Sequence, residues 1–215
     1  MTIRALIFDR DGVLTYFDLA AAATFFAPLL PISVWDMAQQ WQAFGETHGF
    51  PNSMAAERTF FAAFWAQMRL RHGLSLAQHD ALLALDYTQF VRAFADARPA
   101  LRWGRQAGYR IGVLSNFTLA SLDASLRAAG LADEIDAACA ASVIGVAKPH
   151  PAAYRTIAAA LHVAPDECMF FDDEALCVEG AAAAGMRGYL VDRRQASAMA
   201  AGVIHSLDLL QTLTG

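Results

Sequence analysis

The sequence contains few charged residues and no cluster of basic ones. Charged residues make up 17% of the 215-residue chain, and the formal net charge is −5. Proteins that bind nucleic acid through its phosphates need clustered lysine and arginine side chains. We therefore expect no nucleic-acid partner. The apolar content of 56% supports a packed core and argues against a disordered chain.

Cysteine is also scarce. The three cysteines form no C-x-x-C pair, and their odd number leaves one thiol that cannot join a disulfide within the chain: Cys139, Cys168 and Cys177. This pattern favours a reducing, cytoplasmic setting.

Long hydrophobic runs are absent as well. The longest uncharged run, residues 19–35, is interrupted by Pro28 and Pro31 and lacks the strongly apolar character of a membrane span. Asp9 and Asp11 fall where a signal peptide would carry its apolar stretch, so we expect no secretory signal. We expect a protein without a membrane partner, present as a monomer or a homodimer.

What the sequence does have is a set of short apolar runs typical of buried strands. There are five, at residues 5–8, 111–114, 137–141, 168–171 and 188–191. Beyond about residue 98 they alternate with helical patterns. This order predicts an α/β fold with a Rossmann-like parallel sheet and helices on both faces.

A helical insert interrupts this pattern. About a hundred residues separate the first two predicted strands, too many for one crossover, and residues 16–97 look helical throughout. Apolar residues recur there at helical spacing, as in Phe60, Phe61, Phe64, Trp65 and Met68. We predict a core domain of residues 1–15 and 98–215 and an inserted helical domain of residues 16–97.

Two carboxylates follow the first predicted strand. Side chains alternate along a strand, so Asp9 and Asp11 point the same way if both continue the strand direction. Like charges held together need a cation or a shared proton. From this pair alone, a solvated turn at Asp11-Gly12 is an equally good interpretation.

Polar residues follow other predicted strands too. Ligands of open parallel sheets bind at the carboxyl ends of the strands. These ends and a nearby loop carry Ser115, Asn116, Lys148, Asp172 and Asp173. Two like charges about 4 Å apart repel by about 4 kcal/mol at an effective dielectric constant of 20. Four carboxylates that face one lysine therefore predict a divalent cation, and oxygen ligands favour Mg²⁺.

Together these motifs resemble the haloacid dehalogenase (HAD) superfamily of phosphohydrolases over essentially the whole chain. The D-x-D-G start of the family's first motif matches residues 9–12, which Val13 and Leu14 follow. Its Ser or Thr matches Ser115, its K-P-x-P loop matches residues 148–151, and its acidic pair matches Asp172-Asp173. The insert resembles the family's type 1 cap.

The resemblance implies a role for each acidic residue. Asp9 is the nucleophile that takes the phosphoryl group as an aspartyl phosphate. Asp11 protonates the leaving oxygen and then deprotonates the attacking water. Mg²⁺ is bound by Asp9, by the backbone carbonyl of Asp11, and by Asp173 or Asp172.

The same resemblance assigns the phosphate group to four other residues. Ser115 and Lys148 hold it and stabilise the transition state. Asn116 orients the substrate or Asp9, and Gly12 lets backbone amides approach the phosphate. The implied activity is Mg²⁺-dependent hydrolysis of a small phosphorylated metabolite.

Two positions depart from the family pattern. Arg10 is often apolar in relatives, and we expect it to point away from the aspartate pair in a structural or salt-bridged role. Cys177 stands where many relatives carry a further acid. The consecutive pair Asp172-Asp173 is the family's other pattern, and we expect it to supply the metal ligand without that acid.

Three other functions stay open: a phosphomutase, a haloacid dehalogenase and a non-catalytic domain. A phosphomutase of the same superfamily would protect the aspartyl phosphate from water until a sugar phosphate returns. A haloacid dehalogenase does not need the acid at Asp11, because halide leaves unprotonated. A non-catalytic domain would lose Asp9 or Lys148, and both are present.

The cap is expected to close over the site and to read the rest of the substrate. Its polar candidates are Glu46, His48, Arg58, Arg69, Arg71 and His72, although the helix dipole also explains cations near a helix C-terminus. Its aromatic residues form mainly the cap core. Part of them can instead line an apolar substrate pocket or a dimer face.

Overall fold

A parallel sheet forms the centre of the larger part of the molecule. The computed structural model describes residues 2–194 and 202–213. In these ranges six strands form one parallel sheet in the order β5-β4-β1-β6-β7-β8. They are β1 (Ala5–Phe8), β4 (Arg110–Ser115), β5 (Ala137–Ala140), β6 (Cys168–Asp172), β7 (Arg187–Val191) and β8 (Val203–Ile204). The five predicted strands are confirmed to within one residue at each end, and β8 is an addition.

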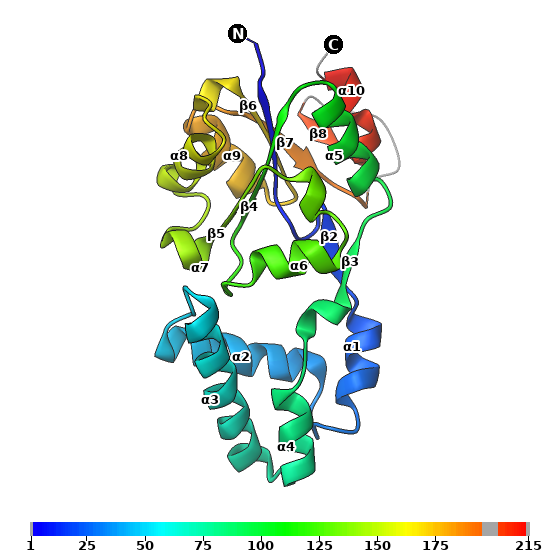
Figure 1. Cartoon of the computed structure of the whole chain (residues 1–215), viewed down its shortest axis with the longest axis vertical. Coiled ribbons are helices and arrows are strands. Elements are labelled where there is room, and N and C mark those ends of the chain that lie inside the picture. Colours follow the sequence, from blue (N-terminus) through cyan, green and yellow to red (C-terminus); the bar gives the residue numbers. More distant parts are fainter. Residues whose placement is uncertain (1, 195–201, 214–215) are drawn as a thin grey trace.

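Helices cover both faces of this sheet (Figure 1). α5 (Ala97–Gln106), α6 (Leu122–Ala128) and α10 (Leu210–Leu213) pack on one face, and α8 (Pro151–Ala160) and α9 (Ala175–Ala183) pack on the other. The central strand β1 shows the reason. Leu6 and Phe8 enter one core cluster, while Ala5 and Ile7 enter the other, and all four are fully buried. A strand buried on both faces reads as a continuous apolar run, and the predicted α/β fold is confirmed.

Shorter elements connect these layers. They are the helix α7 (Ala141–Ile144) and the 3₁₀ turns η2 (Ala132–Glu134), η3 (Pro165–Glu167) and η4 (Leu207–Leu209). The strand predicted to reach residue 141 ends one residue earlier, because Ala141 begins α7. Within the described ranges, none of the helices has the length and apolarity that crossing a membrane requires.

Four helices form a separate bundle beside the carboxyl edge of the sheet, at the lower end of Figure 1. They are α1 (Leu19–Phe26), α2 (Val34–His48), α3 (Met54–His72) and α4 (Leu76–Leu83). Ser33, Ser53 and Ser75 begin the last three by accepting a hydrogen bond from a backbone amide of the first turn. The bundle has its own core cluster, built around Phe64 and Trp65. We refer to it as the cap.

The segment 16–97 is not helical throughout, which corrects the sequence prediction. Its two ends pair as an antiparallel ribbon of β2 (Thr15–Phe17) and β3 (Val91–Ala93). The 3₁₀ turn η1 (Tyr87–Phe90) comes directly before β3. Strands of three residues are too short to show an alternating pattern, and their pairing depends on residues more than seventy positions apart. The ribbon joins cap to core, and the predicted domain boundaries stay a prediction.

Candidate active site

A cavity of about 390 Å³ opens at the carboxyl edge of the sheet. Its walls come from the ends of β1, β4 and β6 and from the loop before α8, as expected for an open parallel sheet. Every predicted site residue contributes to these walls: Asp9, Asp11, Gly12, Ser115, Asn116, Lys148, Asp172 and Asp173. Phe117, Thr118 and Glu174 complete the wall and were not expected.

Lys148 lies between two carboxylates. Its Nζ donates to Asp9 Oδ1 at 2.6 Å and to Asp172 Oδ2 at 2.7 Å. All three residues are buried, with 6%, 7% and 1% of their surface exposed respectively. It is also the sole lysine in the sequence, and its ammonium group is the cation that contacts both Asp9 and Asp172.

Asn116 fixes the backbone of the lysine loop. Its side-chain amide donates to the Lys148 carbonyl at 3.0 Å and accepts from the Lys148 amide at 2.7 Å. Asn116 was predicted to bind phosphate or to orient Asp9, and that role stays a prediction. What its side chain does in this structure is to hold Lys148 in register with β4.

Burial sets the protonation of this cluster. Burial raises the pKa of Asp9 to about 7, because loss of water outweighs the attraction of Lys148. The pKa of Asp172 is raised for the same reason. For Lys148, burial opposes the charged form, but Asp9 and Asp172 outweigh it and raise the pKa of the ammonium. The cluster is therefore short of positive charge, and a proton or a cation stabilises it.

Three carboxylates are placed to supply that cation site. Oxygens of Asp9, Asp172 and Asp173 lie within 4.8 Å of one another. Burial and the neighbouring charge of Asp172 raise the pKa of Asp173 as well. A compact set of hard oxygen donors with excess negative charge fits Mg²⁺.

Gly12 allows Asp173 to take its place. The Gly12 backbone has a φ of +78°, which L-residues with a side chain rarely adopt. A Cβ at this position would also overlap the Asp173 carboxylate. Glycine is therefore required here for its backbone conformation and for the space it leaves to the Asp173 carboxylate.

Asp11 does not join the carboxylate cluster. β1 ends at Phe8 and the chain turns, so Asp11 no longer continues the strand direction. Its side chain is 52% exposed and accepts from Arg10 Nε at 3.0 Å and Nη2 at 2.5 Å. Arg10 is salt-bridged as expected, but its guanidinium turns toward the pair, which corrects the prediction that it points away. Arg10 also donates to Ser125 Oγ at 2.9 Å.

Two long-range contacts at the site were not predicted. Arg193 donates to the carbonyls of Gly12, at 3.1 Å, and Val13, at 2.5 Å, and forms a two-pronged ion pair with Asp96 at 3.0 Å for each bond. This pairing holds the loop that carries the aspartates. No local pattern announces it, because Arg193 lies about 180 residues from the loop.

The second contact joins cap to core. The buried Glu57 on α3 accepts from the amides of Ala120 and Ser121, at 2.7 and 2.9 Å, and from Ser121 Oγ at 2.5 Å. Tyr87 also contacts Ser121 Oγ through its hydroxyl, at 2.6 Å. The polar cap residues named from the sequence do not line the 390 Å³ cavity within the described part of the chain.

A family model for haloacid dehalogenase-like hydrolases matches residues 3–185. The chain belongs to the haloacid dehalogenase-like hydrolases. This family membership agrees with the order of the motifs and with the parallel sheet, and the predicted HAD resemblance is confirmed.

The relatives of this HAD protein are named either as phosphatases or as haloacid dehalogenases. It is 39% identical over 199 residues to "Phosphatase MT3486" of Mycobacterium tuberculosis (strain CDC 1551 / Oshkosh), covering 90% of this chain and 89% of the relative. The HAD phosphatase structure from Thermococcus onnurineus is 22% identical with a TM-score of 0.66, covering 99% and 98% of the two chains. A 2-haloacid dehalogenase structure from Pseudomonas syringae pv. Tomato DC3000 is 21% identical with a TM-score of 0.70, over the same shares. The two structures establish the shared fold.

Proposed function

We propose that this protein is a Mg²⁺-dependent phosphohydrolase that acts on a small phosphorylated metabolite through an aspartyl phosphate. The observation that carries the proposal is the placement of Lys148 between Asp9 and Asp172, beside a cation-ready carboxylate cluster. A relative named as a phosphatase, 39% identical over most of both chains, supports the same reaction class.

Asp9 acts as the nucleophile. Its carboxylate oxygen forms a bond to phosphorus while the bond from phosphorus to the ester oxygen breaks. Lys148 and the hydroxyl of Ser115, which is buried and lines the cavity, offset the charge that develops on the phosphoryl oxygens. Water then attacks the phosphorus of the aspartyl phosphate, which frees inorganic phosphate and regenerates Asp9.

Asp11 moves the protons. It gives a proton to the departing ester oxygen and later takes one from the attacking water. Asp11 lines the cavity and is half exposed, so its carboxyl can exchange Arg10 for the substrate oxygen. When no substrate is bound, Arg10 holds the Asp11 carboxyl group at the edge of the cavity.

Asp9, Asp172 and Asp173 would hold Mg²⁺, together with the backbone carbonyl of Asp11. The bound ion would supply positive charge to the phosphate and to the three carboxylates. All three cysteines are free and buried, which supports the proposed cytoplasmic setting.

Carbon–halogen cleavage is the second candidate, because haloacid dehalogenases share the fold and are about a quarter identical in sequence. Asp11 favours phosphate chemistry, since an alkoxide leaves poorly without a proton whereas halide needs none. A phosphomutase differs from a phosphatase only in keeping water from the aspartyl phosphate.

The test is phosphate release from a panel of phosphate esters, with and without Mg²⁺. We expect release that needs Mg²⁺ and that disappears in Asp9→Asn. Halide release from 2-haloacids without phosphate release would replace the proposal by the dehalogenase. Alcohol release without stoichiometric phosphate would replace it by the phosphomutase, and full activity of Asp9→Asn would remove the aspartyl phosphate altogether.

A further inference from the structure

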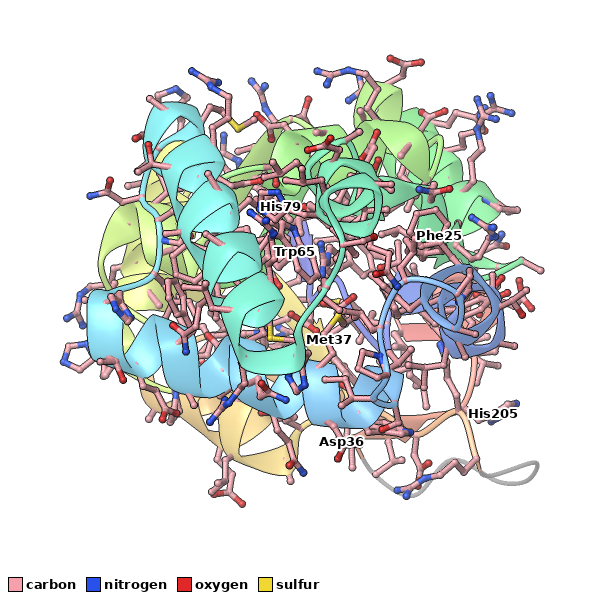
Figure 2. All side chains as sticks on the ribbon, turned by 90° about the horizontal axis from the view of Figure 1, so that it is seen from below. Phe25, Asp36, Met37, Trp65, His79 and His205 are labelled. Carbon is pink, nitrogen blue, oxygen red and sulfur yellow. The ribbon has the colours of Figure 1, made fainter. Side chains whose placement is uncertain are left out.

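A second cavity lies between cap and core, next to the one that holds Asp9. It measures about 260 Å³ and shares two wall residues, Phe117 and Thr118, with the first cavity. The remaining walls come mainly from α1, α2 and α3 and from the β2–β3 ribbon. In Figure 2, which views the cap from below, Met37 and Trp65 of this wall lie toward the centre and Asp36 lies toward the outer side. We name this second space the cap pocket.

The cap pocket is lined by apolar groups. Trp41, Phe61, Trp65 and Phe90 contribute aromatic rings to it, and Leu119 contributes an aliphatic side chain. Such a lining binds through removal of apolar surface from water. The pocket therefore recognises a ligand mainly through its shape and its apolar surface area, and much less through hydrogen bonds.

Two polar side chains in its wall, those of Arg10 and Tyr87, already have partners. Arg10 pairs with Asp11, donates to Ser125 and lies over the Phe117 ring at 3.9 Å. The Tyr87 hydroxyl is bonded to Ser121. A sugar hydroxyl that entered this pocket would lose its hydrogen bonds to water and face mainly apolar side chains. We expect this loss to weaken binding by roughly tenfold for each hydroxyl group.

We propose that the natural substrates are phosphate monoesters of apolar alcohols, whose aromatic or branched aliphatic body occupies the cap pocket. This rests on the proposed function, because Phe117 and Thr118 line both the cavity that holds Asp9 and the cap pocket. The volume of the pocket suits a body about the size of a naphthyl group. Sugar phosphates and nucleotides match the phosphate site but not this pocket.

The exposed rim of the pocket also points to an apolar occupant. Trp35 is 66% exposed, and Leu19 and Phe17 are 41% and 39% exposed. All three line the cap pocket. Grouped exposed apolar side chains mark a binding site more often than an ordinary surface. Continuity with the phosphate cavity selects the substrate body over a second copy of the chain as the occupant.

The kinetic test compares esters that differ only in the alcohol. Phosphate release is measured for ethyl, butyl, hexyl and 2-naphthyl phosphate, and for glycerol 3-phosphate and glucose 6-phosphate. We expect kcat/KM to rise about fourfold for each methylene that reaches the pocket, from the transfer energy of a buried CH₂. Equal values along the alkyl series, or a preference for the polar esters, would overturn the inference while leaving the phosphatase function intact.

A larger side chain in the wall of the cap pocket provides a second test, and the same substitution elsewhere on α2 provides its control. Ala38 on α2 lines the cap pocket, whereas Ala43, also exposed on α2, does not. We expect Ala38→Phe to lower the ratio of kcat/KM for hexyl over ethyl phosphate at least tenfold. Ala43→Phe leaves that ratio at the wild-type value. The same ratio in both variants would contradict the inference.

A binding test separates this inference from the proposed function. Binding of 2-naphthol, which carries no phosphate, is followed by quenching of tryptophan fluorescence in Asp9→Asn, with and without Ala38→Phe. Binding that Ala38→Phe abolishes supports the pocket even if no ester is hydrolysed. Absence of binding overturns it. A wild-type dimer in sedimentation that dissociates in Trp35→Asp also overturns it, because the second copy is then the occupant.

Discussion

At the scale of single residues, the site is organised by one ammonium group among three carboxylates. Lys148 contacts Asp9 and Asp172 directly, while Asp173 adds a third carboxylate without a second cation. The three carboxylates carry more negative charge than the one ammonium group offsets. A bound divalent cation would offset the remainder and would leave the cluster able to accept a phosphate group. The three carboxylates and the lysine could be predicted from the sequence because strand ends and short motifs announce them.

The first prediction concerns Lys148 itself. Lys148→Met leaves two buried carboxylates without their partner, and we expect kcat to fall at least about a hundredfold. Loss of the cation also favours the protonated carboxyl, so the acid limb of the pH–rate profile moves to higher pH. Steady-state phosphate release measures both effects. Arg58→Met removes an exposed cap cation that does not line the cavity and serves as the control. An unshifted acid limb in Lys148→Met would contradict the charge argument.

The second prediction concerns pH and Mg²⁺. The pKa of Asp9 is raised to about 7 from an ordinary value of about 4, so the folded state binds this proton more tightly than the unfolded state. Stability of the metal-free protein therefore falls as pH rises from about 4 to about 7. We expect Mg²⁺ to raise Tm more at pH 8 than at pH 5, because only the ionised carboxylate binds it.

The control for this prediction is Asp9→Asn, which removes the titrating group. Thermal unfolding of both proteins, with and without Mg²⁺, gives the comparison. An equal Mg²⁺ effect at the two pH values in the wild type would be inconsistent with a raised Asp9 pKa.

At the scale of secondary-structure elements, cap and core meet where α3 faces the start of α6. Ser121 begins α6 without a capping side chain of its own, and Glu57 supplies the acceptor from across the interface. Free amides at a helix start favour a negative charge. The helices were predictable from their periodicity, but this contact was not, since it joins residues more than sixty positions apart.

The third prediction tests that contact. Glu57→Gln places an amide donor against groups that donate, and we expect the free energy of unfolding to fall by about 1–3 kcal/mol. Urea denaturation measures the loss. Glu46→Gln provides the matched control, because Glu46 is exposed and bonds only locally, to Gln42. Equal stability of the two variants would show that the contact contributes nothing.

At the scale of the whole molecule, Asp96 and Arg193 tie three distant segments together. Asp96 follows the ribbon, and it accepts from Arg193, from Ser206 Oγ and from the Leu207 amide. Arg193 in turn holds the carbonyls of Gly12 and Val13. These hydrogen bonds connect the segment after the ribbon to the loop that carries Asp9 and Asp11.

The fourth prediction tests this network. Burial alone would raise the pKa of Asp96, but hydrogen bonds from Arg193 and Leu207 outweigh it and lower the pKa. The stability from this group is therefore present above about pH 4 and is lost as pH falls through the folded value. We expect Arg193→Met and Asp96→Asn to lower stability non-additively at pH 7, with a coupling of about 1–3 kcal/mol.

A double-mutant cycle by urea denaturation measures this coupling, and repetition at pH 3 checks the sign. We expect the coupling to shrink in acid. Strictly additive losses at pH 7 would mean that the two side chains stabilise the fold independently.

The sequence by itself determined the sheet, its order of motifs and the edge at which they gather. Apolar runs buried on both faces and turns after each strand are local patterns, and parallel strands bring their carboxyl ends to one edge. The helical bundle was equally readable, apart from the short ribbon at its ends.

Only the tertiary structure decided how the site is completed. It turned Asp11 toward Arg10 instead of Asp9 and placed Lys148 between two carboxylates. It also brought Arg193 to the loop after β1 and set the cap pocket beside the cavity that holds Asp9. Each of these depends on the path of the chain after an element ends or on contacts between distant segments. No periodicity encodes such contacts, because they are fixed by packing rather than by local conformational preference.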